Sequence, residues 1–198
     1  MVVFIVETWL EEARLPGVLK KLNFKSSHCV SRENRGGGLV LLWNSELDVC
    51  VEMSTLYHID AIINKGKADA WGFTGFYGAP KKHNHLESWN LLRSLNQCFD
   101  LPWLCVGDFN EILKAHKKMG GKLRPSKQMQ DFQDAVECGF VDLGFVGNKF
   151  TWCKQTVDGV TVWERLDRAL ANDKWISLYP TSNKVIHLEY GPCCCGKK

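Results

Sequence analysis

Short runs of β-branched and aromatic residues alternate along the chain with longer segments that carry apolar residues at helical spacing. The short runs predict β-strands at residues 2–6, 38–43, 47–53, 58–63, 70–77 and 102–106. Several of these runs are apolar at every position, which is typical of a sheet covered on both faces. The pattern therefore predicts a layered protein of strands and helices.

The helical spacing predicts helices at residues 8–22, 85–98 and 126–138, with Ser126 as an N-cap. Further on, residues 149–152 and 160–163 flank Asp158-Gly159, a strong signal for a β-hairpin. Residues 164–172 predict a short helix. Because a hairpin and consecutive strands accompany the helices, we expect an α/β sandwich with mixed sheets rather than a doubly wound parallel sheet.

Composition adds only general limits to this picture. A chain of 198 residues with 45% hydrophobic and 24% charged residues fits a single domain with a sizeable core. The net charge of +3 gives mild support for a polyanionic partner but does not establish one. Nine cysteines are an odd number in a chain of this size, which favours a reducing intracellular compartment. No stretch reaches the roughly 18 apolar residues of a membrane span, so we expect no membrane partner.

Polar residues follow three of the predicted strands at the point where each strand ends. Glu7 follows the first strand, Tyr77 ends another, and Asp108 and Asn110 follow a third. Carboxylate and amide oxygens at rigid strand ends suit Mg²⁺ and phosphate. Each residue also has an ordinary interpretation, as a helix-start acid, a turn tyrosine or an Asx turn. Both interpretations stay open at this point.

A basic stretch, residues 114–124, follows the strand that ends near Asp108. It would border the same cleft, where Lys117, Lys118, Lys122 and Arg124 would contact backbone phosphates without recognising bases. A solvated mobile loop explains the same composition.

Six motifs in order resemble a known family. They are Glu7-Thr8 after a strand, Arg-Gly-Gly-Gly-Leu-Val-Leu-Leu-Trp at 35–43, Tyr-Gly-Ala-Pro at 77–80, Gly-Asp-Phe-Asn at 107–110, Phe-Thr-Trp at 150–152 and Arg-Leu-Asp-Arg-Ala at 165–169. Together they resemble the endonuclease/exonuclease/phosphatase (DNase I-like) superfamily. The resemblance is greatest to the endonuclease domain of plant non-LTR (LINE-type) retrotransposons and covers about residues 1–188. Six ordered motifs are far more specific than one.

The resemblance implies a four-layered α/β/β/α sandwich that cleaves a DNA phosphodiester with Mg²⁺, or with Mn²⁺ in its place. By motif position, Glu7 matches the metal ligand of the family and Tyr77 its phosphate-contacting tyrosine. Asp108 and Asn110 match the pair that orients water and binds the transition state. The metal and hydrogen-bond donors would stabilise the charge that develops on the phosphate.

Two further positions also follow from the resemblance. Asp167 matches the carboxylate that supports a catalytic histidine, and Trp152 matches an aromatic residue near the DNA cleft. Members usually have an earlier strand that ends in Asn and a closing Ser-Asp-His, and neither motif occurs here; His187 lies within the last expected strand, residues 185–188. The sandwich is therefore expected to be incomplete, with an unstructured tail at 189–198 after a domain at 1–188.

These departures leave three functions open. The first is a Mg²⁺-dependent DNA endonuclease of retrotransposon origin, associated with a reverse transcriptase and weak or inactive because a general acid–base group is missing. The second is a non-catalytic relic that binds nucleic acid weakly or has lost DNA binding, and the third is a phosphatase of the same fold. A flanking polypeptide would supply the missing strand, and a functional protein would act in the nucleus.

Overall fold

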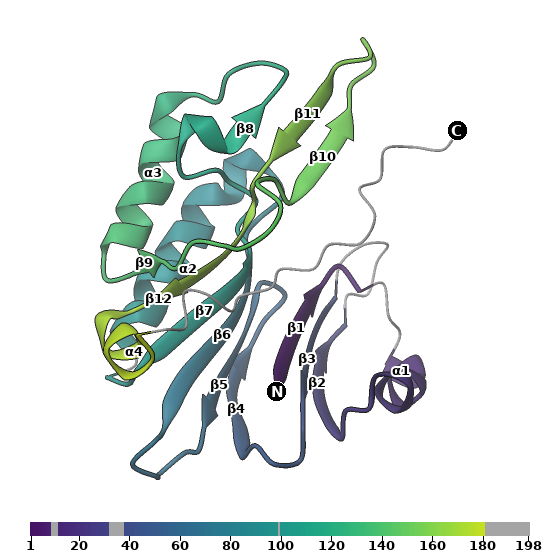
Figure 1. Cartoon of the computed structure of the whole chain (residues 1–198), viewed down its shortest axis with the longest axis vertical. Helices are drawn as coiled ribbons and strands as arrows, with labels where there is room; N and C mark the ends of the chain where they lie inside the picture. Colours follow the sequence, from purple (N-terminus) through teal and green to yellow (C-terminus); the bar gives the residue numbers. More distant parts are fainter. Residues whose placement is uncertain (9–11, 32–37, 99, 181–198) are drawn as a thin grey trace.

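The computed structural model describes residues 1–8, 12–31, 38–98 and 100–180. Two β-sheets pack face to face, and helices lie on the outer face of each sheet, so the layers run α/β/β/α (Figure 1). Helix α1 covers one sheet, whereas α2 and α3 cover the other. The predicted α/β sandwich with mixed sheets is confirmed.

The first sheet has the strand order β1-β3-β2 and is antiparallel throughout. The second has the order β4-β5-β6-β7-β12-β9, in which only β6 and β7 are parallel. A third, small sheet has the order β10-β11-β8. The strands are β1 Val2–Val6, β2 Ser26–Val30, β3 Leu39–Trp43, β4 Val49–Ser54, β5 His58–Ile63, β6 Trp71–Tyr77, β7 Trp103–Asp108, β8 Lys118–Met119, β9 Val141–Asp142, β10 Trp152–Gln155, β11 Thr161–Glu164 and β12 Asp167–Ala171.

The helices connect these strands at the outside of the sandwich. They are η1 Glu12–Arg14, α1 Leu15–Leu22, η2 Lys82–Asn84, α2 His85–Cys98, η3 Ala115–Lys117, α3 Ser126–Glu137 and α4 Asp173–Leu178. Within the described part of the chain, no helix has the length and apolar character needed to cross a lipid bilayer.

The alternation of side chains along each strand builds three apolar layers. In β3, Leu39 and Leu41 pack between the two sheets, whereas Val40 and Leu42 pack under α1. In β7, Trp103 and Cys105 pack under α2 and α3, so that the alternate positions face the other sheet. This fixed alternation determines which polar side chains at the strand ends share a face.

A close contact brings β1 near β6. A Cβ atom on Gly75 would lie 2.2 Å from the Phe4 ring, so only a residue without a side chain lets the two sheets approach this closely. Because Phe4 lies three residues before Glu7 and Gly75 two residues before Tyr77, the contact sets the separation between those two side chains.

Several predicted elements were wrong or incomplete. Residues 164–172 form the end of β11 and all of β12 rather than a helix, because this segment pairs with β7. Ser126 is the first residue of α3 and Pro125 its N-cap, with no capping side chain. The 114–124 stretch contains η3 and β8 and is not wholly a loop. The elements that the sequence pattern did not predict are β2, β8, β9, α4 and the short helices η2 and η3. The predicted tail, His187 and the closing strand lie outside the described residues.

Candidate functional site

Two strands end, and a third begins, with polar side chains on the face between the two sheets. Tyr77 at the end of β6 is the register partner of Asp108 at the end of β7. Asp108 is in turn the register partner of Asp167, the first residue of β12. Tyr77 packs in the layer between the sheets, and Leu104 and Val106, at alternate positions before Asp108, pack there too. The three side chains therefore form one row across the sheet.

Glu7 reaches this row from the opposite sheet. It follows β1 directly and adopts a left-handed backbone conformation with φ 51°, which ends the strand. The Tyr77 hydroxyl donates a hydrogen bond of 2.6 Å to Glu7 Oε1. This bond joins residues 70 positions apart and fixes the carboxylate above the end of β6.

The turn after β7 holds Asn110 beside Asp108. Asn110 is also left-handed, with φ 54°, and its backbone N–H donates to Asp108 Oδ1 at 2.8 Å. Its side-chain Nδ2 donates to the carbonyl of Gly78 at 2.8 Å, which leaves its second hydrogen for another acceptor. Between them, Phe109 is fully buried and its N–H donates to the Leu166 carbonyl. The turn is thus tied to both β6 and β12.

The carboxyl groups of this row are harder to ionise than free carboxyl groups. Burial and, to a smaller extent, the charges of Asp167 and Glu7 together raise the pKa of Asp108 to about 8, although the Asn110 N–H opposes the shift. Burial also raises the pKa of Asp167 to about 6, against a hydrogen bond from Thr151 that lowers it. Such perturbed carboxyl groups are typical of functional sites.

These residues fit a weakly held hard cation. No three His, Cys, Asp or Glu side chains among the described residues are placed to enclose a metal ion. Glu7 therefore offers a single oriented carboxylate, with Asp108 nearby as a second carboxyl group whose ionisation a bound cation would favour. Mg²⁺ suits this arrangement because it binds through one or two carboxylates and keeps water and phosphate oxygens in its shell. A cation would also relieve the repulsion among the acids.

The predicted nucleic-acid contacts lie around the small sheet. Trp152, Glu164 and Lys118 occupy one row across β10, β11 and β8, and Trp152 is partly exposed. Lys118 and Arg124 both pair with Glu164, so their charges are already partly neutralised inside the protein. These roles remain predictions.

The two other lysines that were predicted to contact nucleic acid lie in different surroundings. Lys117 lies over the ring of Phe145, with its Nζ 5.1 Å from the ring centroid. Lys122 is exposed.

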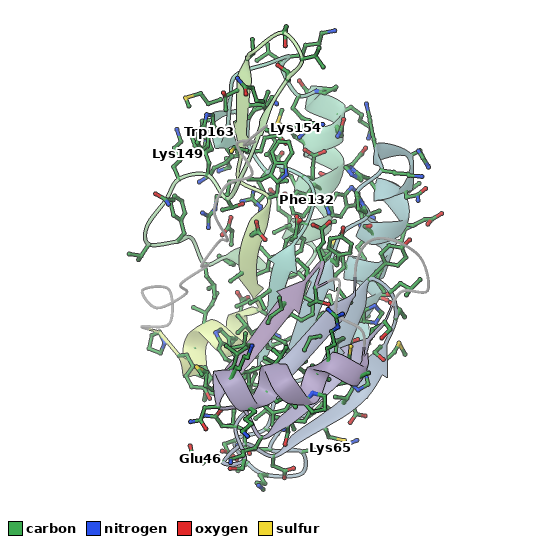
Figure 2. The ribbon with its side chains drawn as sticks, turned by 90° about the vertical axis from the view of Figure 1, so that its right-hand side faces the viewer. Glu46, Lys65, Phe132, Lys149, Lys154 and Trp163 are labelled. Carbon is green, nitrogen blue, oxygen red and sulfur yellow. The ribbon has the colours of Figure 1, made fainter. Side chains whose placement is uncertain are left out.

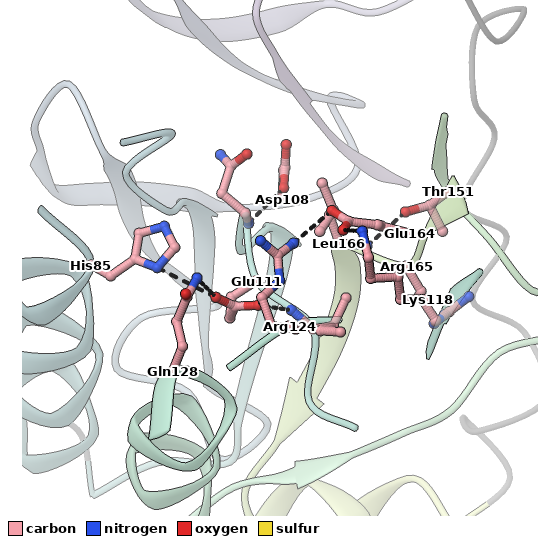
Figure 3. A network of polar contacts seen from close by, with 12 residues as sticks. His85, Asp108, Glu111, Lys118, Arg124, Gln128, Thr151, Glu164, Arg165 and Leu166 are labelled. Atoms are coloured by element: carbon pink, nitrogen blue, oxygen red, sulfur yellow. Dashed lines mark hydrogen bonds and ion pairs between the residues drawn. The ribbon is translucent and has the colours of Figure 1, made fainter. Parts of the chain in front are cut away.

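The buried acid next to Asn110 was not predicted. Glu111 directly follows Asn110 and is fully buried, with its carboxylate facing Arg124, Gln128 and His85 (Figure 3). The signal in the sequence is a lone Glu shortly after Phe109 and directly before Ile112 and Leu113, where a buried charged side chain needs a partner.

The sequence matches the model of one protein family. The model for the Endonuclease/Exonuclease/phosphatase family matches residues 2–183, nearly the whole chain. The chain belongs to this family. The family predicted from the six motifs is therefore confirmed, and in this endonuclease/exonuclease/phosphatase protein the row of Tyr77, Asp108 and Asp167 lies at the motif positions named above.

Solved structures agree on the fold. The endonuclease domain of TRAS1, a telomere-specific non-LTR retrotransposon, superposes with a TM-score of 0.57 at 13% identity, over 84% of this chain and 81% of that domain. An AP endonuclease from Archaeoglobus fulgidus gives 0.61 at 17% identity, over 86% and 76%. The 3′ phosphatase NExo from Neisseria, bound to a product DNA hairpin, gives 0.59 at 15% identity, over 87% and 76%. No curated protein matches the chain in sequence.

Proposed function

We propose that this family member hydrolyses phosphodiester bonds in DNA with Mg²⁺, as an endonuclease of LINE-type retrotransposon origin. The observation that supports this proposal most is the hydrogen bond from Tyr77 to Glu7, beside the row of Asp108 and Asp167. These four polar side chains come from both sheets and lie at one end of the sandwich. Similarity to the TRAS1 endonuclease domain is consistent with the origin, although at 13% identity it shows the fold alone.

Each residue has a defined task in this proposal. Glu7, held by the Tyr77 hydroxyl, would bind the cation, which supplies Lewis-acid stabilisation of charge on the phosphate. The second Nδ2 hydrogen of Asn110 would donate to a phosphate oxygen. Asp108, with a pKa of about 8, would accept a proton from the attacking water once ionised.

We expect cleavage to be slow. Among the residues described by the structure, the carboxylate of Asp167 interacts with Thr151 and nearby arginines, and no histidine contacts it. An imidazole at this point would provide a general acid–base, a contribution of about 10²–10⁴-fold. A slow nuclease is therefore the expected behaviour of this set of side chains.

Nicking of supercoiled plasmid tests the proposal. Wild-type protein with Mg²⁺ should convert plasmid to the open circle slowly, and EDTA or Asp108→Asn should reduce the rate by about 100-fold or more. Asp48→Asn is the matched control, because Asp48 is exposed and its ion pair among the described residues is with the exposed Lys67. Equal conversion by wild type and Asp108→Asn would contradict the proposal. If neither nicks and both bind DNA in a salt-sensitive way, the protein is a binding relic instead.

A further inference from the structure

The strongest feature outside the proposed catalytic row is a buried ion-pair network beside it. Glu111 is fully buried, and its carboxylate accepts hydrogen bonds from the Ile112 N–H at 2.8 Å and from Gln128. Arg124 Nε lies 3.0 Å from Glu111 Oε1, and His85 Nδ1 lies 3.5 Å from Glu111 Oε2. Glu111 is the residue that follows Asn110, so the network begins where the catalytic turn ends.

The same arginine reaches a second acid. Arg124 Nη2 donates to Glu164 Oε2 at 2.7 Å, and Lys118 Nζ lies 2.5 Å from Glu164 Oε1. Figure 3 shows the guanidinium between Glu111 and Glu164. Glu164 ends β11, and Asp167 begins β12 three residues later. One side chain therefore connects the segments that carry Asn110 and Asp167.

We propose that Arg124 is a positioning residue, which holds Glu111 and through it the Asp108–Asn110 turn in the geometry of the candidate site. This proposal deepens the proposed function and relies on it only for the catalytic readout. It assigns Arg124 a task other than the phosphate contact predicted from the sequence.

The turn at Asn110 needs this support because its backbone conformation is energetically unfavourable. Asn110 is left-handed, a conformation that costs a non-glycine residue energy and persists only where the surroundings enforce it. A fully buried carboxylate on the next residue provides that constraint only while it is paired, because an unpaired buried charge is strongly unfavourable. Without Arg124, Glu111 would turn toward water and carry the peptide after Asn110 with it.

Arginine is needed because two carboxylates must be bound at once. Nη2 of its planar guanidinium donates a hydrogen bond to Glu164 at 2.7 Å, while Nε forms an ion pair with Glu111 at 3.0 Å without a hydrogen bond. A lysine ammonium is a point charge on a flexible stem and cannot reproduce this fork. Arg124→Lys should therefore fall between the wild type and Arg124→Met in every readout.

A double-mutant cycle tests whether Arg124 acts through Glu111. In single-turnover nicking, Arg124→Met and Glu111→Gln should each lower the cleavage rate of the folded protein by about 10–100-fold, and the double variant should lose little more than either alone. The dissociation constant for DNA measured without metal should change less than twofold. A rise in this dissociation constant at an unchanged cleavage rate would identify Arg124 as a phosphate contact and overturn the proposal. Additive losses would overturn it too.

A second readout does not need activity. The side-chain amide signals of Asn110, identified by their loss in Asn110→Ala, report its hydrogen bond to Gly78. In ¹H–¹⁵N spectra they should move toward free-amide positions in Arg124→Met, while the signals of the distant Asn64 stay in place. Lys127→Met is the matched control, since Lys127 is exposed and, in the part of the chain that the structure describes, pairs with Asp131. Unchanged Asn110 signals in Arg124→Met would refute the positioning role even if no variant cleaves DNA, and a wild type that fails to nick would count against the proposed function alone.

Discussion

Gly107→Ala is expected to prevent stable folding, the largest effect of any single substitution considered for this chain. Gly107 has φ 152°, and a Cβ atom there would lie 1.9 Å from the Phe76 carbonyl oxygen. Both atoms belong to paired strands, so neither moves without separating β6 from β7. We expect a loss of about 4 kcal/mol or more, in the exceptional range for a point substitution. Thermal unfolding followed by circular dichroism measures it.

Gly66→Ala separates this clash from backbone preference. Gly66 also has a positive φ, of 80°, but a Cβ there meets nothing within 4 Å. It should lose only about 1 kcal/mol, the ordinary cost of alanine in a left-handed position. Equal melting temperatures for the two variants would show that β6 and β7 do not approach as closely as described.

Asp108→Asn should stabilise the protein, and the gain should grow with pH. The folded-state pKa of Asp108 is raised from 3.8 to about 8, so the folded state holds a proton that the unfolded state releases. Stability is therefore lost as pH rises between about 4 and 8. An asparagine carries no charge to bury and still accepts the Asn110 hydrogen bond. We expect a gain of about 2–3 kcal/mol at pH 8.5 and almost none at pH 4.5.

Melting temperatures in EDTA at these two pH values check this prediction. For a chain of this size the gain at pH 8.5 corresponds to about 5–10 °C. Asp48→Asn serves as the control, because exposed ion pairs contribute little. A variant that melts below the wild type at both pH values would mean that Asp108 is not held against its ionisation.

The hydrophobic pattern predicted most of the sandwich because it controls side-chain direction. Strands such as β3 and β6 are apolar runs bounded by turn residues, and their burial leaves few alternatives. The error at residues 164–172 has a specific cause. Glu164-Arg-Leu-Asp-Arg-Ala-Leu-Ala consists mostly of good helix formers, yet Asp167–Ala171 pairs with β7, and tertiary pairing overrides local preference. β8 and β9 have two residues each, too few to show a period.

The site was only partly predictable for a related reason. Glu7, Tyr77 and Asp108 interrupt apolar runs, so their positions at strand ends could be inferred. Their proximity could not, because it depends on how closely β1 approaches β6 at Gly75. Asp167 was identified through family resemblance alone, since its strand was expected to be a helix.

The ion-pair network around Arg124 could not be predicted from the pattern of charges along the sequence. Arg124 lies in a basic stretch whose composition is typical of a solvated surface. Nothing in the sequence indicates that two buried acids face it. Glu111 and Glu164 are 53 positions apart and come together only through the fold. Long-range pairs of this kind require the structure.

Mg²⁺-dependent melting tests most directly whether the strand ends form a cation site. At pH 8, millimolar Mg²⁺ should raise the melting temperature of the wild type by several degrees, because a ligand that binds only the folded state stabilises it. Glu7→Gln should abolish this rise. Glu46→Gln should keep it, since Glu46 is exposed at the end of the molecule opposite Lys149 and Trp163 (Figure 2). The same rise in Glu7→Gln as in the wild type, or no rise in the wild type, would contradict a metal site at Glu7.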